Sequence, residues 1–233
     1  MMTQSLVFVP GLLCTRELFS SQIAALDADA DIMVGDHTQH ASMAEIAASI
    51  LAKAPAKFAL AGLSMGGYIA QEMMRQAPGR ITRLALLDTN SRADRPEQSE
   101  QRRALAALAE KEGNTAKVTE QLLPILVHKS RLADLPLIEI VKRMRADTGV
   151  AAFKRQQAAI IDRPEYRGFL ADIRCPTLVI VGAEDALTPV KVHEEIASAI
   201  PGARLEVIPE CGHLSTLEQP DTVIRLLKAW LSS

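Results

Sequence analysis

A serine flanked by glycines is the first residue whose setting could do chemistry. Ser64 lies in the run Gly62-Leu-Ser-Met-Gly66-Gly67, with a glycine two residues before it and another two residues after it. The pattern Gly-x-Ser-x-Gly is typical of a sharp turn between a strand and a helix, where a Cβ at either glycine would be crowded. Such a turn holds the hydroxyl clear of the chain, at the positive end of a helix dipole. We therefore predict that Ser64 is a nucleophile.

A serine hydroxyl is a weak nucleophile, so the chain must also supply a base that takes its proton. Among five histidines, His213 lies in a loop between a short apolar run and the last amphipathic stretch. Loops at the carboxyl ends of parallel strands carry functional groups in α/β proteins. We predict that His213 is the base. His37, His40 and His128 lie in polar loops or a helical region, and His193 is expected to face solvent.

A third residue, an acid, must orient the imidazole and stabilise its protonated form. Asp185 follows the apolar run 177–182 and is the preferred candidate, with the adjacent Glu184 as a reserve. Asp88, directly after the run 81–87, is a rival because its carboxylate could also reach a histidine. The chain order serine, acid, histidine is the order expected for a serine held at such a turn.

Attack on a carbonyl places negative charge on the substrate oxygen, which then needs hydrogen-bond donors already in place. The backbone N–H of Met65, the residue after the nucleophile, is expected to be one donor. The backbone N–H of Leu12 is the second candidate, because Gly11 allows a tight turn just before it. We predict that these two amides form an oxyanion hole.

The elements that must position these residues follow from the hydrophobic pattern. Apolar runs alternate with amphipathic stretches, which indicates parallel strands covered by helices on both faces. We predict a doubly wound, mostly parallel α/β sheet. The expected strands are 6–9, 32–34, 58–62, 81–87, 177–182 and 205–208, and the expected helices are 17–26, 42–54, 65–76, 190–200 and 221–231.

Residues 90–172 interrupt this alternation and contain only helical patterns, at 96–112, 115–122, 136–147 and 150–161. We therefore predict a core formed by residues 1–89 and 173–233, and a helical cap formed by residues 90–172. The stretch 90–171 holds 15 Lys and Arg against 11 Asp and Glu, although the whole chain has 26 and 28. This basic cap is either a solvated helical surface or a lid that favours anionic substrates.

With these residues in view, the chain resembles the α/β-hydrolase fold family over nearly its whole length. The segments 173–185 and 208–213 are similar to those of small capped esterases and enol-lactone hydrolases. Many relatives have His-Gly in the oxyanion loop, where this chain has Pro10-Gly11. The chain also starts almost directly at the strand before that loop, so we expect six strands without the usual opening hairpin.

The resemblance implies a serine hydrolase that cleaves an ester or lactone of a small carboxylic acid through an acyl-enzyme. One alternative is carbon–carbon bond hydrolysis or a cofactor-free elimination with the same three residues, in which Arg95, Arg143 or Arg155 would clamp a carboxylate. A second alternative is a receptor that binds a ligand beneath the cap without turnover. Candidate substrate-binding residues are Cys14, Phe19, Phe153 and Arg143.

We expect no cofactor and no metal. A metal set of Cys14, Cys211 and His213 has no fourth ligand at a recognisable spacing. The segment 62–67 has the spacing of a dinucleotide-binding loop, Gly-x-Gly-x-x-Gly, but Ser64 stands where that loop needs its middle glycine. We therefore do not expect a bound dinucleotide.

The composition agrees with a small-molecule enzyme. The 233 residues are 48% hydrophobic and 23% charged, which is typical of a globular domain and excludes a disordered chain. A net charge of −2 provides no field that would attract nucleic acid or an anionic membrane. Three cysteines do not form a disulfide framework, and the N-terminal residues lack a basic leader. We therefore expect a cytoplasmic protein whose partner is a small molecule; the sequence indicates no oligomeric state.

Overall fold

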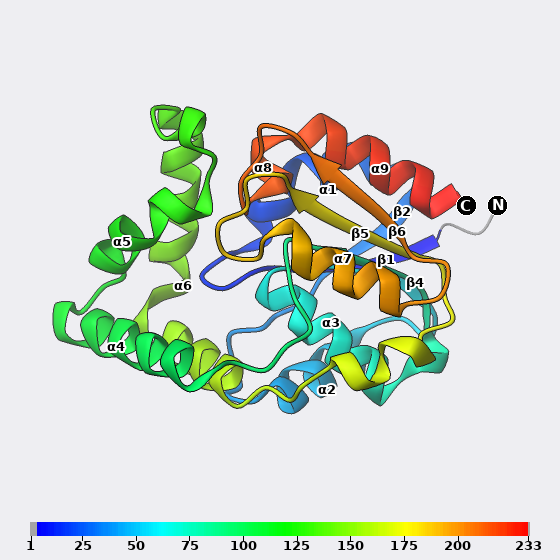
Figure 1. Cartoon of the computed structure of the whole chain (residues 1–233), viewed down its shortest axis with the longest axis horizontal. Helices are drawn as coiled ribbons and strands as arrows, with labels where there is room; N and C mark the ends of the chain where they lie inside the picture. The colour runs from blue at the N-terminus through cyan, green and yellow to red at the C-terminus, as the bar shows by residue number, and fades with distance from the viewer. Residues whose placement is uncertain (1–3, 233) are drawn as a thin grey trace.

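The computed structural model describes residues 4–232 and is built on one sheet of six parallel strands (Figure 1). The strand order is β2-β1-β3-β4-β5-β6. The strands are β1 (Gln4–Val9), β2 (Ala30–Val34), β3 (Phe58–Leu63), β4 (Ile81–Leu87), β5 (Thr177–Gly182) and β6 (Arg204–Ile208). This arrangement confirms the predicted doubly wound α/β sheet.

Strand β1 shows why the predicted strands are continuous apolar runs. Successive side chains point to opposite faces of a sheet. Leu6 and Phe8 therefore pack in one hydrophobic cluster, while Val7 and Val9 pack in the other. All four side chains are fully buried. Both faces of the sheet are covered, so both need apolar residues. A strand that alternated apolar and polar residues would bury its polar side chains away from water.

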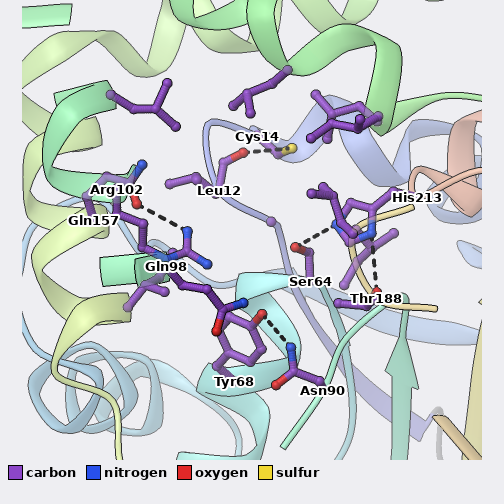
Figure 2. A pocket seen from close by; sticks show the side chains of 18 of the residues that line it. Leu12, Cys14, Ser64, Tyr68, Asn90, Gln98, Arg102, Gln157, Thr188 and His213 are labelled. Carbon is purple, nitrogen blue, oxygen red and sulfur yellow. Dashed lines mark hydrogen bonds between the residues drawn. The ribbon is translucent and has the colours of Figure 1, made fainter. Parts of the chain in front are cut away.

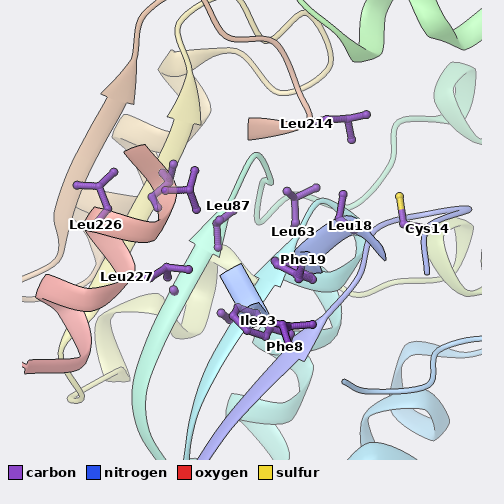
Figure 3. Packing of buried hydrophobic residues seen from close by; sticks show 14 of the residues in the cluster. Phe8, Cys14, Leu18, Phe19, Ile23, Leu63, Leu87, Leu214, Leu226 and Leu227 are labelled. Carbon is purple, nitrogen blue, oxygen red and sulfur yellow. The ribbon is translucent and has the colours of Figure 1, made fainter. Parts of the chain in front are cut away.

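Helices cover both faces of this sheet. Helices α1 (Ser20–Leu26), α8 (Ser215–Glu218) and α9 (Pro220–Ser232) cover one face, where Leu226 and Leu227 pack against the cluster that includes Phe8 (Figure 3). The other face is covered by α2 (Met43–Lys53), α3 (Met65–Gln76) and α7 (Val190–Ala199). No helix in the described part of the chain has both the length and the apolar character needed to cross a membrane.

Most predicted elements are present, with shifted ends. The predicted helix 17–26 is divided into a 3-10 turn, Arg16–Phe19, and α1. Strand β2 begins two residues earlier than predicted, at the buried Ala30. Strand β2 lies at the edge of the sheet, where Asp31 is exposed and the three residues after it are half-buried. Its apolar pattern in the sequence is therefore weaker than that of a central strand.

Residues 90–172 contribute no strand and form α4 (Pro96–Glu112), α5 (Ala116–Leu126) and α6 (Leu135–Ile161). Helix α5 runs four residues beyond its predicted end and contains Pro124 in its last turn, where the missing N–H costs one hydrogen bond. The two predicted helices after it are joined in α6 at a kink where Gly149 has φ 72° and ψ 171°. Only glycine adopts this conformation readily.

The helices α4–α6 stand together at one side of the sheet (Figure 1). Towards the end of this insert, Ile160, Tyr166 and Leu170 pack in the same hydrophobic cluster as Val7 and Val9. The division into core and cap at residues 89/90 and 172/173 stays a prediction, and side chains from the last part of the insert contribute to the core.

Candidate active site

The turn between β3 and α3 places Ser64 in a strained conformation. Its φ of 57° and ψ of −116° lie outside the regions that non-glycine residues prefer, at a cost of about 1–3 kcal/mol. A Cβ at Gly66 would lie 1.9 Å from the carbonyl oxygen of Val9, and a Cβ at Gly62 would lie 2.2 Å from that of Gly66. The two glycines are therefore needed for the close approach of α3 to the strands.

The hydroxyl of Ser64 is directed at a histidine. Ser64 occupies the N-cap position of α3, but its side chain makes no capping hydrogen bond. Its Oγ lies 2.8 Å from Nε2 of His213 (Figure 2). The loop after β6 supplies this histidine, whose backbone N–H donates to the carbonyl of Leu126 at the end of α5. The insert therefore helps to fix the loop that carries the imidazole.

A buried carboxylate sets the tautomer of His213. Oδ2 of Asp185 lies 2.8 Å from Nδ1 of the imidazole. The same carboxylate accepts hydrogen bonds from the backbone N–H groups of Leu187 and Thr188 and from the hydroxyl of Thr188. An ionised carboxylate only accepts, so Nδ1 carries the proton and the lone pair of Nε2 faces Ser64.

Burial and the neighbouring charge shift the pKa values of His213 and Asp185 in opposite directions. Burial alone would lower the pKa of His213, but the charge of Asp185 and its hydrogen bond outweigh burial and raise that pKa above its ordinary value. Burial would likewise raise the pKa of Asp185, yet His213 and the Thr188 donors hold it below its ordinary value. The pair therefore favours a charged carboxylate beside an imidazole that accepts a proton readily.

The two other candidate acids have different partners. Asp88 accepts hydrogen bonds from the backbone N–H of Gly182 and from the N–H and hydroxyl of Ser215. Burial and the nearby Asp185 raise the pKa of Asp88 to about 8. Glu184 accepts a hydrogen bond from the backbone N–H of Cys211. Asp185 is therefore the acid that the structure places against the imidazole.

The expectation that His193 faces solvent is wrong. Its side chain is fully buried on α7, and Nε2 accepts a hydrogen bond from the backbone N–H of Thr89 at 2.8 Å. Burial lowers the pKa of this imidazole to about 4. Thr89 also donates its hydroxyl to the carbonyl of Ser64 at 2.8 Å. His193 thus supports the segment that holds the turn at Ser64.

The loop after β1 holds one peptide group in a fixed orientation. The carbonyl oxygen of Gly11 accepts hydrogen bonds from Nε2 of His37 at 2.8 Å and from the backbone N–H of Cys14 at 3.1 Å. In a trans peptide the N–H of the next residue, Leu12, points the opposite way. A Cβ at Gly11 would lie 3.4 Å from Cβ of Ser64, so this peptide lies beside the serine.

Two backbone N–H groups near Ser64 have no acceptor. Neither the N–H of Leu12 nor that of Met65 donates a hydrogen bond within residues 4–232. Met65 is the first residue of α3, where the N–H groups have no acceptor within the helix. These groups can therefore donate to a ligand that approaches the hydroxyl.

Ser64 and His213 open into a cavity of about 220 Å³ between the sheet and the insert. The apolar part of its lining includes Leu12, Leu105, Leu122, Ile125, Leu126 and Leu187. The polar part includes Tyr68, Asn90, Gln98, Arg102 and Gln157 (Figure 2). This volume suits a small molecule with an apolar part and a few polar groups.

Comparison with known proteins places the chain in a family. A model of the alpha/beta hydrolase family matches residues 6–226. The chain belongs to the alpha/beta hydrolase family. It is 30% identical over 177 residues to a protein of Mycobacterium tuberculosis that is named as a non-heme bromoperoxidase. That match covers 73% of this chain and spans 65% of the relative's length.

Two solved structures have the same fold. A thermophilic esterase from Thermogutta terrifontis, with malate bound, is 30% identical and matches with a TM-score of 0.91, covering 98% of this chain and 89% of that one. The enol-lactonase from Burkholderia xenovorans is 23% identical and matches with a TM-score of 0.89, covering 100% and 93%. The resemblance to esterases and enol-lactone hydrolases of this family is thereby confirmed at the level of the fold.

Of the four predicted substrate-binding residues of this α/β-hydrolase, only Cys14 lines the cavity. Phe19 is fully buried in the core and stacks on Phe8 with ring centroids 4.4 Å apart. Phe153 is buried in a small cluster with Leu13. Apolar packing therefore explains both rings.

Arg143 does not line the cavity either. Arg143 faces outward on α6, where it forms an ion pair with Glu17. Arg95 and Arg155, the other cationic candidates, do not line the cavity either. The arginines that do line it are Arg102, Arg145 and Arg163.

The spacing of Arg145 in the sequence indicates a buried position on a helix. Arg145 follows Ile138 and Val141 at helical spacing, on the buried face of α6. Arg143 lies on the opposite face, two residues away.

Across residues 4–232, no group of three or more His, Cys, Asp or Glu side chains could hold a metal ion.

Proposed function

We propose that this α/β-hydrolase is a serine hydrolase that cleaves an ester or lactone of a small carboxylic acid through an acyl-enzyme. The observation that carries the proposal is the hydrogen-bonded series from Ser64 through His213 to Asp185, with 2.8 Å at each step. The serine end of this series opens into a cavity of small-molecule size. Membership of the hydrolase family supports the same reaction class.

In the first half of the reaction, Ser64 acts as the nucleophile. Its Oγ attacks the carbonyl carbon of the substrate while Nε2 of His213 takes the hydroxyl proton. The π electrons of the carbonyl move to its oxygen. The carbonyl then re-forms, and the bond between the acyl carbon and the alcohol oxygen breaks. The imidazolium gives its proton to the leaving alcohol oxygen. Asp185 stays ionised and stabilises the positive imidazolium between these two transfers.

In the second half, water takes the place of the alcohol. His213 removes a proton from the water, whose oxygen attacks the acyl carbon. The bond to Oγ breaks, Ser64 recovers its proton from His213, and the carboxylic acid leaves. With a lactone, the alcohol formed in the first half remains attached to the acyl group, so a single hydroxy or keto acid is released.

The N–H groups of Leu12 and Met65 form the oxyanion hole in this mechanism. Both are near Ser64, and both lack an acceptor among the described residues. Because the acceptor of its bond is a carbonyl, Nε2 of His37 must carry a proton and donate it to Gly11. This bond fixes the peptide that presents the N–H of Leu12, and a polarised carbonyl also makes that N–H a stronger donor.

Replacing His37 by alanine is expected to lower kcat by about 10- to 100-fold, less than the loss of an oxyanion donor itself. KM is expected to change little, because the donor matters most when the oxyanion forms. Steady-state kinetics on a p-nitrophenyl ester measures both constants. His40, a half-buried loop residue three positions later, provides the control His40→Ala. Equal rates for the two variants, or a His37→Ala defect confined to KM, would remove His37 from this role.

Carbon–carbon bond hydrolysis with the same residues is the second candidate, favoured by the cationic side chains that line the cavity. Inactivity towards short p-nitrophenyl esters, together with turnover of a vinylogous diketone, would select this reaction over ester cleavage. Ligand-dependent stabilisation without any product would instead indicate a receptor.

A fluorophosphonate label tests the proposed function directly. The label reacts with a serine that is activated by a neighbouring base. Peptide mass spectrometry is expected to find one adduct, on Ser64, and prior labelling is expected to stop hydrolysis of p-nitrophenyl esters. Labelling that persists in the Ser64→Ala protein would disprove the proposed nucleophile.

A further inference from the structure

Arg145 is a buried cation that has no anionic partner among residues 4–232. Only 3% of the residue is exposed, and it belongs to the lining of the cavity that contains Ser64. Its Nε donates a hydrogen bond to the hydroxyl of Thr119 at 3.0 Å. Its Nη2 has no hydrogen-bond partner in the described structure, and Arg145 is absent from the ion pairs of residues 4–232.

The two other arginines of the cavity share one carboxylate, so each contacts an anion although the three groups together keep one positive charge. Both Arg102 and Arg163 form ion pairs with the carboxylate of Asp94, at 2.6 Å each. The side chain near Arg145 that could become an anion is Cys14, but burial raises the pKa of this thiol to about 11. Cys14 is therefore neutral near pH 7, and Arg145 remains uncompensated.

An unpaired charge in this position is costly. Taking a guanidinium out of water without a counter-charge destabilises the fold, and replacement by an apolar side chain of similar volume is often neutral or stabilising. Burial lowers the pKa of Arg145 to about 10, so the group still carries its charge near neutral pH. Fold stability thus gives no reason for an arginine here.

The orientation of Arg145 is already fixed. Thr119 holds Nε, and the hydroxyl of Thr115 donates to the backbone carbonyl of Arg145 at 3.0 Å. These contacts tie the backbone and Nε of Arg145 to Thr115, the N-cap of α5, and to Thr119 within α5, and they leave Nη2 without a partner in the described residues. Two parallel N–H groups on one edge of a guanidinium match the two oxygens of a carboxylate.

We propose that Arg145 binds a carboxylate of the substrate, so that the substrates are anionic esters or lactones, half-esters of small dicarboxylic acids among them. This inference rests on the proposed function, and it adds the charge of the substrate and the residue that recognises it. Binding would bring a counter-charge to a cation that otherwise has none, and neutral esters of the same size would lack this contribution.

Matched substrate pairs test this charge selection. Mono-p-nitrophenyl glutarate and p-nitrophenyl pentanoate have similar acyl lengths and differ in one terminal carboxylate. The pair 4-acetoxybenzoate and 4-methylphenyl acetate places the carboxylate on the alcohol side instead. For one of the pairs, the wild-type protein is expected to show a kcat/KM at least about 10-fold higher on the anionic member, and Arg145→Met is expected to lower that value about 100-fold.

The control variants separate this role from general damage. Arg143→Met removes an exposed arginine two residues away on the same helix and is expected to change neither member of either pair. Arg145→Lys keeps the charge without the planar fork and is expected to recover part of the preference. Equal kcat/KM on both members of both pairs, or a preference that survives in Arg145→Met, would overturn the proposal.

A binding measurement separates failure of this inference from failure of the proposed function. In the Ser64→Ala protein, which cannot form an acyl-enzyme, glutarate is expected to raise Tm, whereas it is expected to have no effect when Arg145→Met is added. If the wild-type protein hydrolyses no ester but glutarate still raises Tm through Arg145, the proposed reaction is wrong and the carboxylate subsite stands. If esters are hydrolysed at Ser64 and glutarate has no effect on Tm, the subsite is wrong.

Discussion

Replacing Ser64 by alanine is expected to reduce kcat for ester hydrolysis by about 10⁴- to 10⁶-fold. The substitution removes the only protein atom proposed to bond to the acyl carbon, so the two-step route through an acyl-enzyme is lost. The N–H groups of Leu12 and Met65 remain, and they can still stabilise an oxyanion formed by direct attack of water. A residual rate above the uncatalysed one is therefore expected.

The measurement is pre-steady-state release of p-nitrophenol with substrate in excess, which shows a burst only if an acyl-enzyme accumulates. Ser198→Ala is the control, because Ser198 lies exposed on α7 and bonds only within that helix. Substrate binding should survive in Ser64→Ala, since the cavity is otherwise unchanged. Retention of more than about a tenth of the wild-type rate in this variant would contradict covalent catalysis at Ser64.

Replacing Asp185 by asparagine is expected to reduce kcat by about 10⁴-fold without unfolding the protein. An asparagine amide can donate to Nδ1 of His213, which would favour the tautomer whose proton lies on Nε2. That tautomer cannot accept the proton of Ser64. The new side chain also has no charge with which to stabilise the imidazolium that forms during proton transfer.

The pH dependence of this variant follows from the sign of the His213 shift. His213 must be neutral to act as a base, so kcat/KM falls as the pH drops through its pKa in the free protein. Asp185 raises that pKa above the ordinary value of 6.5. The wild-type protein is therefore expected to lose activity on the acid side with a midpoint above 6.5, and Asp185→Asn is expected to move that midpoint to lower pH.

Asp88→Asn is the matched control, because Asp88 is a second buried carboxylate near the same histidine. Its hydrogen bonds go to Gly182 and Ser215 and not to the imidazole. A loss of less than about 10-fold in kcat is expected, with a smaller movement of the acid midpoint. If Asp88→Asn lost as much activity as Asp185→Asn, the two carboxylates would have to act on His213 as a unit.

The sequence determined those features whose cause is local. Strands 81–87 and 177–182 have their predicted ends, because a run of apolar residues between turn-forming residues has few alternatives. Helices 65–76 and 96–112 also have their predicted ends, because Pro78 and Gly113 follow them and stop a helix. The turn at Ser64 was equally predictable, since its tight geometry admits only glycine at positions 62 and 66. The carboxyl ends of parallel strands lie at one edge of a sheet, which is why the loops with Asp185 and His213 could be expected near Ser64.

Only the tertiary structure decided between residues whose local settings are alike. Asp88 and Asp185 both follow buried strands, and the choice between them depended on a separation of 2.8 Å across the fold. Arg143 and Arg145 belong to the same helix, but α6 turns one towards Glu17 and the other into the cavity. His193 has charged neighbours in the chain, yet its imidazole is buried against Thr89. In each case the surroundings come from segments distant in sequence, and no pattern along the chain encodes them.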